Sequence, residues 1–293
     1  MSKARSLVLV AGAYLLAIGV AAVWLGWGPS TGRLLLDTLI ADVLATLVVF
    51  GFSRYYRNSS FYDAYWSVIP PLLLLYWWSQ AGPGVDRLRC ALVAGVVVLW
   101  AIRLTFNWIR SFPGLHHEDW RYPVLRRRAG RWELLADLVA IHLVPTVQVF
   151  VGMLPVYVAV TRPGPGLTWL AWLAAVLGLA AVALEFVADQ QMYDFVATRS
   201  PGQACTRGLW SWSRHPNYFG EFGFWFALAL FGVAAAPAEA WWLFVGAALM
   251  LAMFLFASIP LMEQRSLARR PDYQRVIDRV SRFVPRPPRR ATT

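Results

Sequence analysis

The sequence predicts an all-α fold, a polytopic integral membrane bundle of about eight transmembrane helices with both termini in the cytoplasm. Composition is the first reason, because 58% of the 293 residues are hydrophobic and only 15% are charged, whereas soluble domains have roughly 45–50% and about 25%. The second reason is a series of apolar runs near the roughly 20 residues that a helix needs to cross a bilayer. These runs are Leu7–Trp27, Leu34–Phe52, Phe61–Ser79, Leu88–Ile109, Leu134–Tyr157, Leu167–Val187, Tyr218–Ala235 and Ala240–Ile259.

The runs differ in strength. Lys3 and Arg5 precede the first one, as in a signal peptide, but its length favours a spanning helix that is retained. The second run is weakened by Asp37 and Asp42, and the seventh is the shortest. The remaining runs are assigned as spans on length and apolar composition alone.

The distribution of Lys and Arg sets the orientation, because these residues concentrate in cytoplasmic loops. With the N-terminus inside, most of the 27 basic residues fall in inner segments, and the outer loops hold only Arg33, Arg87, Arg89 and Arg162. The net charge of +11 therefore reflects topology rather than nucleic-acid binding. The arginine clusters at 126–131 and 286–290 also suit contacts with anionic lipid headgroups.

Domain organisation follows from continuity, because no long linker, repeat or low-complexity tract divides the chain. We expect a single membrane domain over residues 1–293, with N-terminal helices in 1–60, a core in 61–264 and a basic cytoplasmic tail in 265–293. The four histidines and two cysteines are too scattered to specify a metal site, so no metal is expected.

Ionisable residues within the runs, or at their ends, indicate a polar cavity. A charge at the bilayer centre costs roughly 2.5–3.5 kcal/mol, so such residues usually face a bundle interior or a wet cavity. Acidic residues collect on the predicted cytoplasmic side, and we expect the cavity to open there. The residues are Asp63, Arg103, Asp137, His142, Glu185, Asp189, Glu221 and Glu263.

Glu185 and Asp189 form the first constellation that could line this cavity. Their i,i+4 spacing puts both carboxylates on one helix face. Like charges repel there unless arginines compensate them or ligand hydroxyls donate hydrogen bonds to them. The alternative is a solvated helix end paired with Arg199.

The segment Ser213–Glu221 forms the second constellation. Pro216 and Asn217, the latter a candidate N-cap, predict a helix start, whose free N–H groups suit a phosphate. Arg214 could bind a phosphate oxygen, and Gly220 would let a backbone or a ligand approach closely. The alternative is a well-capped helix with a snorkelling arginine.

The loop 116–122 forms the third constellation, and its titratable and aromatic groups suit a lid or nucleotide clamp. An exposed loop can equally be polar for solubility alone. Neither a Gly-x-Gly-x-x-Gly nor a Walker motif is present, so a nucleotide would have to be held between membrane helices.

Three segments resemble the steroid 5-alpha-reductase family, and most closely its bacterial branch. They are Leu209-Trp-Ser-Trp-Ser-Arg-His-Pro-Asn-Tyr-Phe-Gly-Glu221, Glu185-Phe-Val-Ala-Asp-Gln-Gln191 and His117-Glu-Asp-Trp-Arg-Tyr122. The resemblance extends from about Ser53 to Pro287. Membrane isoprenylcysteine methyltransferases and sterol reductases share only the Arg-His-Pro-x-Tyr part.

The resemblance implies a reductase-like core in 61–264 that binds NADPH from the cytoplasmic side and reduces a carbon–carbon double bond conjugated to a ketone. It implies that Asp189 contacts the cofactor, that Asn217 lines the pocket, and that arginines bind the phosphates. The expected cofactor-binding residues are Arg121, Glu185, Asp189, Arg199, Arg207, Arg214, His215, Asn217, Tyr218, Gly220 and Glu221.

The substrate end departs from the family. The Gln-Glu pair and the tyrosine that hold the ketone in steroid reductases fall at Tyr62-Asp63 and Trp100, and Glu263 falls where a histidine stands near the nicotinamide. Asp63 could act as an acid, and Tyr62 or Tyr65 could donate to an enolate oxygen. The expected catalytic residues are Asp63, Tyr62, Tyr65 and Glu263. A flat or chain-like lipid fits this end, and a steroid is not implied.

We therefore expect an NADPH-dependent oxidoreductase acting on CH–CH groups, in a bacterial inner membrane, as a monomer or weak oligomer among membrane lipids. One alternative is an S-adenosylmethionine-dependent methyltransferase, although those enzymes usually carry two consecutive glutamates where this chain has Glu263-Gln264. Another alternative is a non-enzymatic relative that binds a lipid or cofactor.

Overall fold

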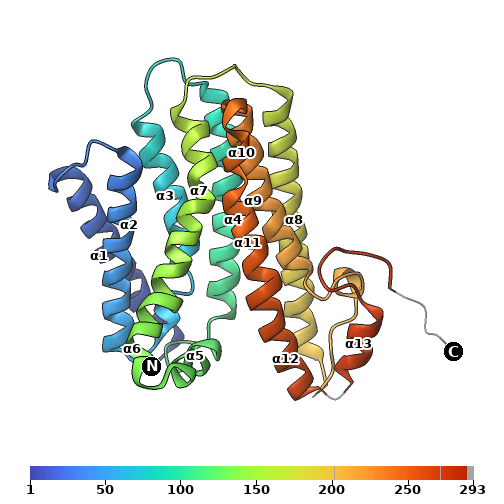
Figure 1. Cartoon of the computed structure of the whole chain (residues 1–293). Coiled ribbons are helices and arrows are strands. Elements are labelled where there is room, and N and C mark those ends of the chain that lie inside the picture. Colours follow the sequence, from blue (N-terminus) through green and yellow to red (C-terminus); the bar gives the residue numbers. More distant parts are fainter. Residues whose placement is uncertain (201, 271, 289–293) are drawn as a thin grey trace. The chain divides into compact units, whose positions relative to one another are not determined.

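The computed structural model describes residues 1–200, 202–270 and 272–288. Within these residues the regular structure is helical, and the only β pairing is an isolated bridge between Ser213 and Ser281, which confirms the predicted all-α class. The predicted tail and its 286–290 cluster lie partly outside the described residues. The α-helices are α1 (Lys3–Trp27), α2 (Leu34–Tyr55), α3 (Tyr65–Ser79), α4 (Arg87–Ser111), α5 (Arg121–Ala129), α6 (Glu133–Ala136), α7 (Val144–Thr161), α8 (Trp169–Thr198), α9 (Pro216–Ala235), α10 (Ala240–Leu243), α11 (Val245–Met253), α12 (Ile259–Arg269) and α13 (Tyr273–Arg279) (Figure 1).

Seven helical segments of the described chain are long and apolar enough to cross a membrane, which makes this an integral membrane protein. They correspond to seven of the eight predicted runs. Two of them are interrupted by π-helical turns, at Asp137–Leu143 before α7 and at Phe254–Ser258 before α12. Such turns often mark functional positions in helices.

The third predicted run differs from the prediction. Its helix, α3, has only 15 residues and is therefore about 22 Å long, less than the roughly 30 Å of a hydrocarbon core. The chain reaches α3 through a 3-10 turn at Ser59–Phe61. Asn58 caps this turn by accepting a hydrogen bond from the backbone N–H of Ser60 (2.9 Å), and Tyr14 donates to the carbonyl of Phe61 (2.7 Å). Polar side chains thus satisfy a buried, non-helical entry that an apolar run does not reveal.

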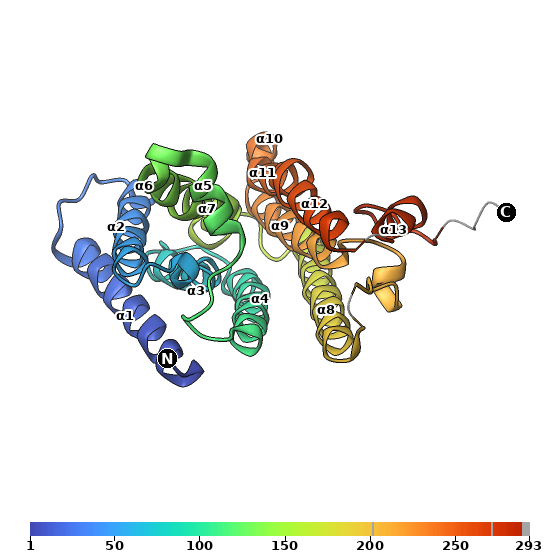
Figure 2. The ribbon, with the colours of Figure 1, turned by 90° about the horizontal axis from the view of Figure 1, so that it is seen from below.

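The helices belong to two compact units. The first contains residues 1–81 and 100–153, and the second contains residues 82–99 and the chain from 154 onward. In the first unit, α1, α2 and α3 pack together (Figure 2). Its aromatic core includes Trp77, which donates to Thr38 (3.1 Å) and meets the Phe150 ring edge to face at 5.8 Å.

In the second unit, the core is the long contact between α8 and α9, which lie side by side (Figures 1 and 2). The 30 residues of α8 span about 45 Å, so its last turns extend past the predicted end at Val187. Arg89 is fully buried within α4 rather than in a loop. Its guanidinium donates to the carbonyls of Ala159 and Arg162, at 2.9 and 2.7 Å.

Gly220 shows how closely α8 and α9 approach. A Cβ at this position would lie 2.5 Å from Cγ of Glu185 and 3.0 Å from the carbonyl oxygen of Ala181. We expect Gly220→Ala to lower the free energy of unfolding by about 1–3 kcal/mol, the usual cost of overpacking. Thermal unfolding of the purified protein in detergent, followed by tryptophan fluorescence, measures the effect.

The matched control is Gly19→Ala in α1, where a Cβ would meet no atom within 4 Å. Because alanine favours a helix over glycine by about 0.8–1.0 kcal/mol, this variant should be as stable as the wild type or more so. Equal stability of the two alanine variants would contradict the close helix contact.

Candidate functional site

The two predicted catalytic tyrosines of the first unit have different hydrogen-bond partners. The hydroxyl of Tyr62 pairs with Oγ1 of Thr146 at 2.7 Å, whereas the hydroxyl of Tyr65 donates to Oδ1 of Asp42 at 3.2 Å. The two rings nevertheless pack against each other, with centroids 5.5 Å apart. Glu263, the fourth predicted catalytic residue, belongs to the second unit.

Asp63 has the properties of an acid. It precedes α3, and its Oδ1 accepts a hydrogen bond from the hydroxyl of Tyr122 at 2.5 Å. Burial raises the pKa of Asp63 to about 6, while the hydrogen bond from Tyr122 acts in the opposite direction. A carboxyl group with a pKa near the working pH is suited to proton transfer, so its acid role stays a chemically reasonable prediction.

The 116–122 loop is fastened to the turn before α3. Asn58 donates to the carbonyls of Leu115 and His117, at 2.9 and 3.0 Å. Oε1 of Glu118 accepts from the backbone of Ser59 (2.7 Å), and Oγ of Ser60 accepts from that of Asp119 (3.0 Å). The loop is therefore an ordered cover for the turn.

Arg121, which was expected to bind a phosphate, pairs with the neighbouring Asp119 at 2.8 Å. Its side chain is partly exposed, and its phosphate role stays a prediction.

A buried ionic network lies beside this turn, and we call it the Asp137 network. Asp137 is only 1% exposed, and Arg54 donates to its Oδ2 at 2.9 Å. Ser59 donates to Oδ1 at 2.7 Å. The π-helical turn brings the ring of His142 within 2.8 Å of the Asp137 carbonyl and 3.0 Å of Ser53 Oγ. The sequence indicates that Asp137 and His142 are ionisable residues in a span, but it does not reveal this network, because the partners come from distant segments.

In the second unit, Glu263 on α12 gathers three basic side chains. Its Oε1 accepts from Nε of Arg214 at 2.6 Å and lies 3.4 Å from Nε2 of His215, while Oε2 lies 3.7 Å from Arg282. Burial lowers the pKa of His215, so its ring is neutral near pH 7. We call these four residues the Glu263 cluster.

Arg214 also attaches α9 to α13. Its Nη1 donates to the carbonyls of Ile277 and Val280, at 2.9 and 2.6 Å, and its side chain is 7% exposed. Arg214 is thus largely occupied by contacts within the protein. Its expected contact with a phosphate stays a prediction.

The start of α9 differs in one respect from the prediction. His215 is the N-cap residue, and Pro216 is the first helical residue, because proline has no N–H to satisfy and its φ angle suits this position. Asn217 is therefore not the N-cap. Its side chain instead donates to Oδ1 of Asp189 at 3.3 Å, which joins two predicted cofactor residues across α8 and α9. The ring of Tyr218 stacks between those of His215 and Phe254, with centroids 5.6 and 4.9 Å away.

Two other predicted cofactor residues, Glu185 and Gly220, meet where α8 and α9 pack together, and a third, Glu221, bonds within α9. Glu185 is 1% exposed, so its interpretation as a solvated helix end is wrong, and Gly220 packs directly against it. Glu221 accepts a hydrogen bond from Nε1 of Trp225 at 2.9 Å. Gly220 was expected to let a backbone or a ligand approach closely, and in the structure helix α8 is the element that approaches it.

Arginines gather near the end of α8. The segment that contains Arg207 folds back along the helix, because Leu209 N–H donates to Gln191 at 2.9 Å. Burial and the neighbouring charges of Arg199 and Arg269 lower the pKa of Arg270. Arg207 and Arg270 both act on the thiol of Cys205, whose pKa burial raises. We call Arg199, Arg207, Arg269 and Arg270 the arginine cluster.

The arginine cluster lacks a counter-charge. In the described part of the chain, no carboxylate forms an ion pair with any of the four arginines. Arg199 and Arg207 were predicted as cofactor residues, but Arg270 was missed because only the folded chain brings α12 to this place.

The family model described as "Protein of unknown function (DUF1295)" matches residues 49–280. The chain belongs to the DUF1295 family. The DUF1295 match includes the Asp137 network, α8, α9 and most of the Glu263 cluster, whereas α1 and the first part of α2 precede it.

One relative shares nearly the whole chain. An uncharacterized protein of Schizosaccharomyces pombe is 28% identical over 282 residues, which cover 88% of this DUF1295 chain and 81% of the relative. No solved structure matches significantly. Among the described residues, no group of three or more His, Cys, Asp or Glu side chains is placed to hold a metal ion.

Proposed function

We propose that this protein is an NADPH-dependent membrane reductase that adds hydride to a carbon–carbon double bond, conjugated to a carbonyl, in a lipid-like substrate. The DUF1295 family is related to the steroid 5-alpha-reductases, and the segments at 117–122, 185–191 and 209–221 together carry that likeness. When bound, NADPH supplies the hydride.

The uncompensated arginine cluster is the observation that carries the proposal. Four like-charged side chains close together repel one another, and Arg270 is partly buried, so an anion that binds there relieves both the repulsion and the missing counter-charge. The diphosphate and 2′-phosphate of NADPH are such anions. The residues present therefore fit the phosphate end of the cofactor.

Asp189 and Asn217 suit the uncharged polar parts of the cofactor. The carboxylate of Asp189 accepts hydrogen bonds and the amide of Asn217 can both donate and accept, which is the chemistry that ribose hydroxyls require. Because Asn217 holds Asp189, the two groups are oriented before a ligand arrives. The proton that the reduction needs is assigned to Asp63, which Tyr122 orients.

Cofactor binding tests the proposal. NADPH at about 100 times its Kd should stabilise the purified protein by about 2.7 kcal/mol, measured as a rise in Tm in detergent. Because Asp189→Ala removes a hydrogen bond from a charged acceptor, worth about 1.5–3 kcal/mol, it should weaken NADPH binding about tenfold or more. Arg207→Gln should weaken binding of NADPH more than that of NADH if this arginine binds the 2′-phosphate.

Two controls complete the test. Arg275→Gln removes an 81% exposed arginine of α13 and should leave NADPH binding unchanged. S-adenosylmethionine should give no rise in Tm. Stabilisation by S-adenosylmethionine and not by NADPH would replace the reductase with a methyltransferase. If the protein binds NADPH but does not oxidise it with any enone lipid, the reductase activity is excluded and a cofactor-binding protein without that activity remains.

A further inference from the structure

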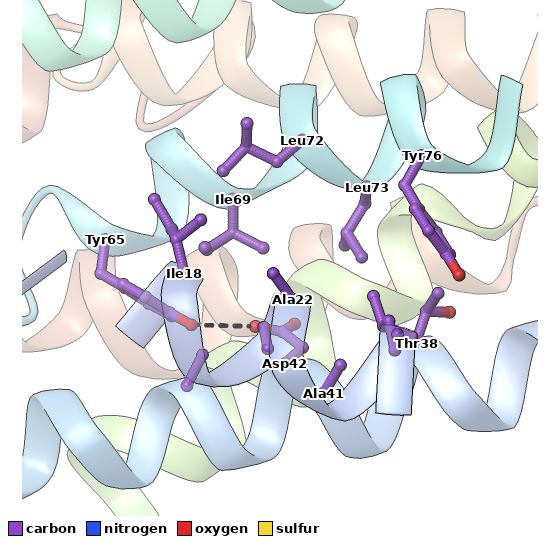
Figure 3. Close-up of a pocket in the computed structure, with 14 residues that line it drawn as sticks. Ile18, Ala22, Thr38, Ala41, Asp42, Tyr65, Ile69, Leu72, Leu73 and Tyr76 are labelled. Atoms are coloured by element: carbon purple, nitrogen blue, oxygen red, sulfur yellow. Dashed lines mark hydrogen bonds between the residues drawn. The ribbon is translucent and has the colours of Figure 1, made fainter. Parts of the chain in front are cut away.

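An apolar cavity of about 310 Å³ lies within the first unit, between α1, α2 and α3. This volume is at the lower end of the roughly 300–1,000 Å³ of ligand sites. Figure 3 shows Ile69, Leu72 and Leu73 of α3 on one side and Ala41 and Asp42 of α2 on the other. We call it the Asp42 cavity.

The cavity exists because small residues stand where the helices face one another. Ala21, Ala22 and Gly26 of α1 and Ala41 and Ala45 of α2 line it. Small residues ordinarily let membrane helices approach closely. Here the bulkier residues of α3 keep that helix away from α1 and α2, and a space remains between the three helices.

Asp42 is the polar group that distinguishes this cavity from a lipid-filled gap. It is 5% exposed, and one carboxylate oxygen accepts from the hydroxyl of Tyr65 at 3.2 Å (Figure 3). The other oxygen has no hydrogen-bond partner among the described residues. Thr38, also on the cavity wall, is already engaged, because it donates to the carbonyl of Leu34 at 2.8 Å and accepts from Trp77 at 3.1 Å.

The chemistry of the wall selects the ligand. An acceptor in apolar surroundings is costly unless a donor reaches it, so a ligand with a hydrogen-bond donor is favoured. No Lys, Arg or His lines the cavity, which disfavours a phosphate or carboxylate headgroup. An ammonium group has three donors, and the free oxygen of Asp42 and the hydroxyl of Tyr76 satisfy them less completely than they satisfy the one donor of a hydroxyl. A hydroxyl group has one donor and matches.

We propose that the Asp42 cavity binds a lipid alcohol, whose hydroxyl donates to the free carboxylate oxygen of Asp42 and whose hydrocarbon chain lies between α1 and α3. Asp42 and the lining of α1 precede residue 49, where the DUF1295 match begins. The α1 and α2 sides of the site precede the family match, whereas its α3 side lies within it, and the site does not depend on the proposed reductase activity.

Photolabelling of the full-length protein in nanodiscs tests the site. A diazirine derivative of 1-dodecanol should label peptides from α1, α2 and α3, and 1-dodecanol should compete about tenfold better than dodecane. The factor corresponds to one hydrogen bond to a charged group, about 1.5 kcal/mol. Equal competition by the alcohol and the alkane would overturn the proposal.

Two variants separate the hydroxyl contact from the cavity itself. Asp42→Leu replaces the carboxyl group with an apolar group of similar branched shape and should retain labelling while abolishing the preference for 1-dodecanol over dodecane. Ala22→Phe should fill the cavity and abolish competed labelling of all three helices. Labelling that Ala22→Phe leaves unchanged would place the probe on the outer lipid-facing surface, and a preference that survives Asp42→Leu would remove Asp42 from the site.

Discussion

Replacing Asp137 with alanine is expected to lower the free energy of unfolding by about 3–5 kcal/mol, the usual loss when one partner of a buried ion pair is removed. The carboxylate is 1% exposed and binds Arg54 and Ser59, at 2.9 and 2.7 Å. Its removal leaves the buried part of Arg54 without its nearest counter-charge. Urea or thermal unfolding in detergent measures the loss.

Glu133→Ala is the matched control, because Glu133 pairs with the same arginine at 3.1 Å but is 49% exposed. Exposed pairs contribute about 0–1 kcal/mol, so this variant should lie within about 1 kcal/mol of the wild type. Similar losses in the two variants would show that Asp137 stabilises the protein no more than a surface carboxylate does. Asp137→Asn, which can still accept from Ser59, should fall between them.

The helices could be predicted from the sequence because apolar length is a property of each segment by itself. The exception, α3, is informative. The run that begins at Phe61 is apolar throughout most of its length, but Asn58 and Tyr14 stabilise a 3-10 turn there. The contact of Tyr14 comes from a helix distant in the sequence, so no local pattern could reveal it.

The candidate site was predictable only in part, for a related reason. The i,i+4 spacing correctly indicated that Glu185 and Asp189 share a helix face. In the structure, however, Glu185 is buried, whereas Asp189 accepts a hydrogen bond from Asn217 of α9. Tyr62 and Tyr65 are close in the sequence but have different partners. Which direction a side chain takes depends on the backbone that the tertiary contacts impose.

Removing the carboxylate of Glu263 is the second change with a large expected effect. Arg214 is 7% exposed, and within the described residues Glu263 is the only carboxylate in ion-pair range of it. Because the ring of His215 is neutral near pH 7, Glu263 mainly balances the charges of Arg214 and Arg282. Glu263→Ala leaves a buried guanidinium uncompensated, which costs about 3–5 kcal/mol.

The contacts of Arg214 predict which part of the protein loses stability in Glu263→Ala. Its Nη1 donates to the carbonyls of Ile277 and Val280 at the end of α13. In Glu263→Ala the amides of α13 should therefore exchange hydrogen faster than in the wild type, while the exchange of the α1 amides should change less. Glu263→Gln retains an acceptor for Nε and should lose less stability. Asp272→Ala, which removes a 79% exposed partner of Arg275, should change the free energy of unfolding by less than about 1 kcal/mol. Unchanged protection of α13 in Glu263→Ala would mean that the carbonyl contacts alone hold Arg214, and the cluster would then contribute little to the attachment of α13.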